Sequence, residues 1–209
     1  TEIDRHVPAH AAVVHLEVTE GSRRRKVVFT GDIGRPGTPI IRDPTPPASA
    51  DILISECTYG ARIHDKDADV EERLREILGA TASRGGQILI PAFSVGRTQT
   101  LVFHLHELFL SGRLPPMPVF VDSPLAVNAT EVFRAHPECY DEWAMSFLSN
   151  HADPFGFRRL TYVRSLEESK SLNHHEGPCV IISASGMMES GRVLHHLKRL
   201  CVDPRNTIL

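Results

Sequence analysis

The feature that most constrains the fold of this chain is a short apolar strand that stops at a Gly-Asp pair. Residues 27–29 are apolar, and glycines follow at positions 31 and 34. A buried strand that ends in this way places the carboxylate of Asp32 at its carboxyl end, and the glycines let the backbone turn without a Cβ clash. A second strand, at residues 51–55, ends in the same way at Glu56. An acid after one strand is more typical of a turn or a helix cap, but two acids after neighbouring strands predict a functional site.

The rest of the sequence indicates an α/β fold. Residues 11–30 are typical of a β-hairpin, and residues 34–50 form a connection rich in proline and glycine. Because strands and helices alternate further along, we predict a parallel, Rossmann-like sheet. We expect strands at residues 87–90, 118–121 and 179–183, and helices at residues 69–83, 95–110, 124–135, 138–149, 166–173 and 189–200.

Composition and charge exclude several classes of protein. No apolar run approaches the roughly 20 residues of a membrane span, so we expect a soluble protein with no membrane partner. The net charge of −3 gives no global attraction to nucleic acid, and the basic run at residues 23–26 fits the solvated corner of a hairpin. The four cysteines are widely spaced. This argues against a zinc ribbon or a disulfide framework and predicts a reducing compartment, the cytoplasm.

Six motifs, taken in order, carry a resemblance to a known family. The first three are His6-Val7-Pro8, Phe29-Thr30-Gly31-Asp32 and Ser55-Glu56-Cys57-Thr58-Tyr59-Gly60, and the others occupy residues 90–99, 121–126 and 183–188. In this order they resemble the metallo-β-lactamase-fold nucleases of the β-CASP group. That group includes the mRNA 3′-end-processing endonuclease and its bacterial and archaeal RNase relatives. Each motif alone is unspecific, but the ordered set extends over essentially the whole chain.

The resemblance implies an α/β fold in two parts. Residues 1–66 would be part of a metallo-β-lactamase-type αββα sandwich, and residues 67–203 would be the inserted β-CASP domain. Residues 204–209 would begin the strand that returns to the first domain. The chain would then be a fragment that lacks both ends. In the family, the His-x-His-x-Asp-His motif lies before the point where this chain starts, and two further functional histidines lie after the point where it stops.

The resemblance also implies Zn²⁺ as the cofactor, with two ions per intact active site and most of their ligands outside this chain. Asp32 matches the carboxylate that bridges the two ions, and a metal-bridged hydroxide would attack the phosphodiester. His6 matches the histidine of the family's Gly-His-x-x-Gly-Ser-Ala phrase and would bind one ion. Here both glycines and the serine of that phrase are replaced. His10 is therefore a rival ligand.

Glu56 and three strand-to-helix turns complete the expected site. In the family, the acid that matches Glu56 pairs with a histidine, absent from this chain, and helps to protonate the leaving group. The alternative is an acid that caps a loop. The turns would bind phosphates of RNA, expected to be single-stranded, because helix starts present N–H donors, although plain helix capping would use the same residues. The residues expected to contact the substrate are Ser94, Arg97, Ser123, Ser185 and Gly186.

Two histidine pairs are weaker candidates for a metal site. His104 and His106 lie in one predicted helix, and His195 and His196 lie in another. Side chains at these spacings point to different faces of a helix. We therefore interpret all four as ordinary helix positions.

Together the motifs predict a zinc-dependent ribonuclease that hydrolyses RNA phosphodiester bonds in RNA processing or decay. This chain would be its central portion, with little activity alone. Two alternatives stay open: a non-catalytic scaffold subunit of an RNA-processing complex, which the altered phrase around His6 would fit, and a small-molecule metallohydrolase of the same superfamily, for which the insert is longer than needed. A homodimer is compatible with the resemblance.

Overall fold

A computed structural model of the 209-residue chain describes residues 2–4, 12–34, 36–61, 70–151 and 153–209. The chain divides into two compact units. The first unit comprises residues 1–66 with 139–145, and the second unit comprises residues 67–138 with 146–209. Each unit is described by itself below. The assignment of residues 1–66 to a metallo-β-lactamase-type domain stays a prediction.

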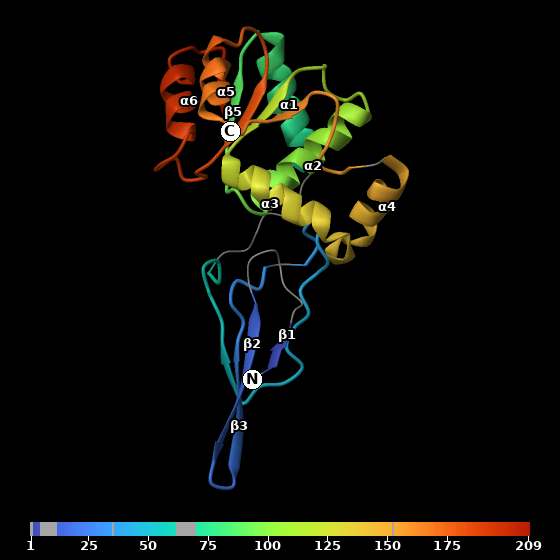
Figure 1. Cartoon of the computed structure of the whole chain (residues 1–209), viewed down its shortest axis with the longest axis vertical. Helices are drawn as coiled ribbons and strands as arrows, with labels where there is room; N and C mark the ends of the chain where they lie inside the picture. The colour runs from blue at the N-terminus through green and yellow to red at the C-terminus, as the bar shows by residue number, and fades with distance from the viewer. Residues whose placement is uncertain (1, 5–11, 35, 62–69, 152) are drawn as a thin grey trace. The chain divides into compact units, whose positions relative to one another are not determined.

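The first unit contains a four-stranded sheet whose strands are in the order β1-β2-β3-β4. The strands are β1 (Glu2–Asp4), β2 (Val13–Glu20), β3 (Arg23–Phe29) and β4 (Ile52–Ile54) (Figure 1). β2 and β3 form the predicted hairpin, and β4 lies parallel to β3. Ion pairs from Arg24 to Glu17 and from Arg25 to Asp51 partly neutralise the basic corner. The hairpin prediction is confirmed.

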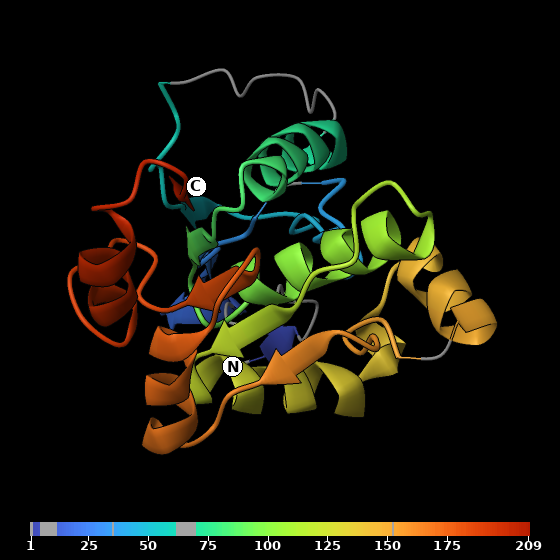
Figure 2. The same cartoon turned by 90° about the horizontal axis from the view of Figure 1, so that it is seen from above.

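The second unit contains a five-stranded parallel sheet in the order β7-β6-β8-β5-β9. Helices lie around this sheet (Figure 2). The strands are β5 (Ile88–Pro91), β6 (Val119–Asp122), β7 (Leu160–Tyr162), β8 (Val180–Ser183) and β9 (Thr207–Ile208). The helices are α1 (Val70–Ser83), α2 (Arg97–Leu110), α3 (Pro124–Ala135), α4 (Glu142–His151, shared between the units), α5 (Leu166–Ser171) and α6 (Val193–Leu200). The predicted parallel α/β sheet is confirmed.

The three central strands of this sheet form its core. Leu89 of β5 and Ile181 of β8 are fully buried, and Val193 and Leu200 of α6 pack with them. Strands that are covered on both faces have near-continuous apolar sequences, as these do. Their carboxyl ends lie at one edge of the sheet because the strands are parallel. This geometry gathers the turns that follow β5, β6 and β8.

Helix α6 and strand β7 differ from the sequence-based expectation. Helix α6 begins at Val193, because Gly191 adopts φ 84°, which a helix cannot contain, and a Cβ there would meet the Ala184 carbonyl oxygen at 2.6 Å. Strand β7 was not predicted, because three residues are too short for a periodic signal. Within residues 204–209, β9 pairs with β5 in the second unit's sheet. That these residues begin the strand that returns to the first domain stays a prediction.

Among the described residues, no helix is both long and apolar enough to cross a lipid bilayer. Helices α1 and α2, at 14 residues each, fall below the length that a span requires.

Candidate functional site

The first unit brings the two predicted acids to the ends of adjacent strands. Phe29 of β3 is in register with Ile54 of β4. Beyond the last pair, the Thr30 backbone N–H donates to the Ile54 carbonyl at 3.0 Å, and the Thr30 hydroxyl donates to Ser55 Oγ at 3.2 Å. Asp32 follows β3 by three residues, and Glu56 follows β4 by two. The prediction that these strands are neighbours is confirmed.

The Asp32 side chain is exposed, and no described residue donates a hydrogen bond to it. Gly31 allows the turn before it by adopting φ 57°. A carboxylate with both oxygens accessible can bind a cation, since each oxygen can face a different ion. Asp32 therefore fits the expected metal ligand chemically. His6 and His10, the other candidates, lie outside the described residues.

Glu56 is held as a charged acceptor by the loop that follows it. The Thr58 backbone N–H donates to Glu56 Oε2 at 2.7 Å. This hydrogen bond lowers the pKa of Glu56 below its usual value. An ionised Glu56 can accept a hydrogen bond from a partner histidine but cannot itself donate a proton near neutral pH. The contact is also that of an acid capping a loop, so the catalytic role stays a prediction.

The second unit gathers the three predicted turns at the carboxyl edge of its sheet. Ser94 follows β5, Ser123 follows β6 and Ser185 follows β8, and these strands are adjacent in the order β6-β8-β5. The hydroxyls of Ser94 and Ser123 lie 3.1 Å apart. Ser123 is buried and caps α3, accepting a hydrogen bond from the Ala126 backbone N–H at 3.2 Å. These contacts show capping by Ser123, and its contact with phosphate stays a prediction.

Arg97 and Gly186 line an open cavity of about 460 Å³ at this edge, together with the half-exposed Phe93. Gly96, with φ 79°, precedes Arg97 at the start of α2. The Arg97 side chain is exposed, and no carboxylate among the described residues pairs with it. A free guanidinium over an apolar cavity can bind an anionic group bidentately.

The sequence analysis missed a buried network centred on Asp122, the last residue of β6. Arg192 donates to Asp122 Oδ1 at 2.6 Å, while Ser169 and His196 donate to Oδ2 at 2.6 and 2.7 Å. Burial alone would raise the pKa of Asp122, but the hydrogen bonds from His196, Ser169 and Arg192 outweigh it and lower the pKa. The network ties the turn after β8 to β6.

His196 is therefore a buried hydrogen-bond partner of Asp122 and not an ordinary helix position, contrary to our interpretation. The signal was available in the spacing, because Arg192 and His196 are four residues apart and point to one side of α6. The sequence did not reveal which acid would receive them.

Comparisons with known proteins identify a family and several relatives. Residues 98–209 match the family model of the Beta-Casp domain. A ribonuclease of Thermus thermophilus is 36% identical over 205 residues, which are 98% of this chain and 46% of the relative. The RNase J-like protein of Methanocaldococcus jannaschii is 32% identical over 202 residues, covering 95% of this chain and 45% of that protein.

A eukaryotic relative is also similar. The cleavage and polyadenylation specificity factor 73 of Drosophila melanogaster is 30% identical over 186 residues, covering 88% of this chain and 26% of that protein. The chain thus spans less than half the length of each of these three relatives.

Proposed function

The chain belongs to the β-CASP family of metallo-β-lactamase-fold proteins, and on this basis we propose that the protein containing it is a ribonuclease. It would hydrolyse phosphodiester bonds of RNA in RNA processing or decay. Relatives named as ribonucleases in a bacterium and an archaeon, together with a eukaryotic cleavage factor, support this substrate class. The cytoplasmic location and the homodimer stay predictions.

The observation that carries the proposal is the accessible carboxylate of Asp32 beside the strand that leads to Glu56. Two bound Zn²⁺ ions would lower the pKa of the attacking water and neutralise charge on the phosphate. Asp32 would bridge them, with His6 or His10 as a further ligand. A catalytic zinc site takes about three protein ligands and a water, so the ions require more ligands than the described residues supply.

The second unit would supply the contacts to RNA. Arg97 would bind a backbone phosphate, and the exposed ring of Phe93 would stack on a base. Ser94, Ser185 and Gly186 would present their turn to the same strand of RNA. Stacking requires unpaired bases, which favours single-stranded RNA.

Cleavage of RNA by the full-length protein tests the proposal. We expect a labelled single-stranded RNA to be cut, the activity to disappear after dialysis against a chelator, and Zn²⁺ to restore it. An RNA that stays intact even when Zn²⁺ is supplied would identify a scaffold subunit. Hydrolysis of a small thioester with no effect on RNA would identify a small-molecule hydrolase. Either outcome would overturn the ribonuclease proposal.

A variant of Arg97 tests the expected RNA contact. Arg97→Ala in the full-length protein should weaken RNA binding and lower the slope of log affinity against log salt by about 0.7, the value for one phosphate contact on a single strand. Titration of a fluorescent RNA at several salt concentrations measures both. The matched control is Arg23→Ala at the hairpin corner, which should change neither. An equal effect of the two variants would place the RNA on the basic hairpin instead.

A further inference from the structure

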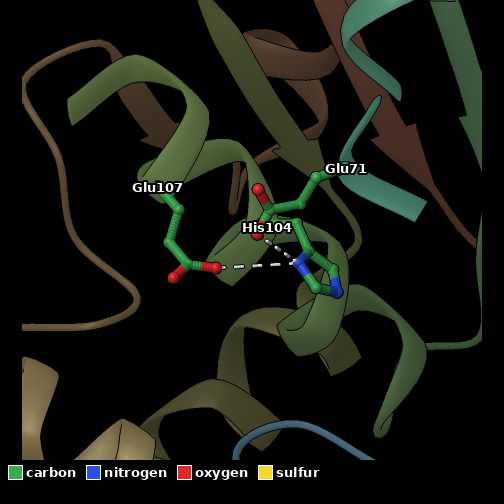
Figure 3. Close-up of side chains that lie close together, drawn as sticks. All are labelled: Glu71, His104 and Glu107. Atoms are coloured by element: carbon green, nitrogen blue, oxygen red, sulfur yellow. Dashed lines mark ion pairs between the residues drawn. The ribbon is translucent and has the colours of Figure 1, made fainter. Parts of the chain in front are cut away.

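A second cluster of metal-type side chains lies between α1 and α2 in the second unit. His104 and Glu107 are three residues apart on α2 and point to the same side, and Glu71 reaches them from the first turn of α1 (Figure 3). His106, by contrast, is buried elsewhere, with its Nδ1 3.1 Å from the Pro154 carbonyl oxygen. The cluster is separate from Asp32 in sequence and lies in the other unit.

The two distances from His104 to the glutamates are close to those between ligands of one cation. His104 Nδ1 lies 3.6 Å from Glu71 Oε1 and 3.7 Å from Glu107 Oε2, and one ligand atom from each residue lies within 4.8 Å of the others. A direct N–H···O hydrogen bond would be about 2.7–3.2 Å long. Two ligands on a tetrahedral ion with bonds of about 2.0–2.1 Å would lie roughly 3.4 Å apart. The observed distances are too long for the first arrangement and close to the second.

Two atoms in the cluster are buried without a partner. His104 Nδ1 and Glu107 Oε2 are both inaccessible to solvent, and neither has a hydrogen-bond partner among the described residues. The His104 side chain retains only 11% of its exposure. Buried polar atoms are nearly always paired with protein, water or an ion. These two atoms lie 3.7 Å from each other.

The surroundings leave one oxygen of Glu71 available for an ion. Arg113 donates to Glu71 Oε2 at 2.9 Å, which turns Oε1 towards His104. In metal sites, residues that surround the ligands often orient a carboxylate ligand by binding its second oxygen, as Arg113 does here. Burial raises the pKa of Glu107, and the nearby Glu71 raises it further against the opposing effect of His104. A cation placed between them would stabilise both carboxylates.

We propose that Glu71, His104 and Glu107 bind one divalent transition-metal ion of the Zn²⁺ class, which joins α1 to α2. An imidazole nitrogen with two carboxylate oxygens suits Zn²⁺ and its neighbours, whereas Mg²⁺ and Ca²⁺ prefer oxygen ligands alone. Three protein ligands leave a fourth position for water. The ion has a structural role, because it connects the start of one helix to the middle of another.

Zinc titration of the chain tests this site. The wild-type chain should bind Zn²⁺ in competition with a chromogenic chelator, and Zn²⁺ should raise its unfolding temperature. His104→Gln and Glu107→Gln should each weaken this binding by at least about 100-fold, since even residues behind a ligand contribute about 10–100-fold. The matched control is His136→Gln, an exposed histidine that pairs with Glu138 and should bind Zn²⁺ as the wild type does.

The rival arrangement is an ion cluster in which protonated His104 lies between two glutamates without metal. It predicts that stability depends on pH and not on Zn²⁺. Equal zinc affinity and equal stabilisation in the wild type and both cluster variants would overturn the proposal. A wild-type chain whose unfolding temperature is unchanged by Zn²⁺ would overturn it as well.

Circular dichroism in the presence of a chelator checks that each variant folds. Glu107→Gln should fold, because it removes a buried charge beside Glu71. Either result leaves the ribonuclease proposal untouched, because that proposal rests on Asp32.

Discussion

Replacing Asp122 by alanine is expected to destabilise the second unit by about 3–5 kcal/mol, the usual cost of removing one partner from a buried ion pair. The carboxylate is fully buried and accepts hydrogen bonds from Arg192, Ser169 and His196. Alanine would leave the His196 imidazole, only 2% exposed, and the largely buried Arg192 without their acceptor. The loss should also release the turn that holds Ser185.

Urea denaturation followed by circular dichroism measures the change in the free energy of unfolding. The matched control is Asp203→Ala, which removes a partly exposed carboxylate that pairs with the exposed Arg205. The free energy of unfolding of this variant should be close to that of the wild type, because ion pairs at the surface contribute little to stability. If both variants lost the same stability, the buried network would not be what fixes β6 to α6.

The same network predicts a pH dependence. The pKa of Asp122 is lowered in the folded state, so its stabilising contribution is present above the unfolded value of about 3.9 and is lost as the pH falls through the folded pKa. When the pH falls from about 5 through the range in which carboxylates titrate, the wild type should lose this contribution to its stability. Asp122→Asn cannot ionise, so it should lose less stability over the same pH change. Urea midpoints measured across this range provide the comparison.

Asp32→Ala should abolish most RNA cleavage by the full-length protein without changing its stability. Residues behind a metal ligand already contribute about 10–100-fold to activity, so removal of a bridging ligand should cost at least about 100-fold. The exposed Asp32 has no hydrogen-bond partner among the described residues, so its loss disrupts no contact there. Initial rates of RNA cleavage and thermal unfolding measure the two effects separately.

The control for Asp32 is Asp43→Ala in the proline-rich connection. Asp43 accepts a hydrogen bond from the Gly37 backbone N–H at 2.7 Å and has no expected metal role. Cleavage by this variant should remain within a few-fold of wild type. An Asp32→Ala protein that kept its activity would show that residue 32 does not bridge the ions.

Local signals explain what the sequence could predict. The bounds of α3 follow from Ser123 and Pro124, because the serine caps the helix and proline suits its first turn. The two strands that lead to Asp32 and Glu56 follow from two similar strand ends. The parallel sheet follows from the alternation of apolar runs and amphipathic segments. Each individual strand or helix is indicated by residues that lie within a few positions of one another.

The features that the sequence could not predict depend on contacts between residues far apart in the chain. Glu71 and His104 are brought together only by the packing of α1 on α2, so the His104-x-x-Glu107 spacing lacked its third member. The partners of Asp122 come from two later helices, α5 and α6. The short strand β7 depends on its neighbour β6 in the sheet, since three residues are too few to show a pattern of their own.

The close approach of Gly186 to Phe93 limits which residues can replace Gly186 in the cavity that both residues line. A Cβ at position 186 would lie 3.1 Å from both the Phe93 backbone nitrogen and its ring, so any larger residue must push that ring outwards. The ring is half exposed and has room to move, whereas the backbone does not. A change at Gly186 would therefore reshape the mouth of the cavity while the sheet beneath it stays intact.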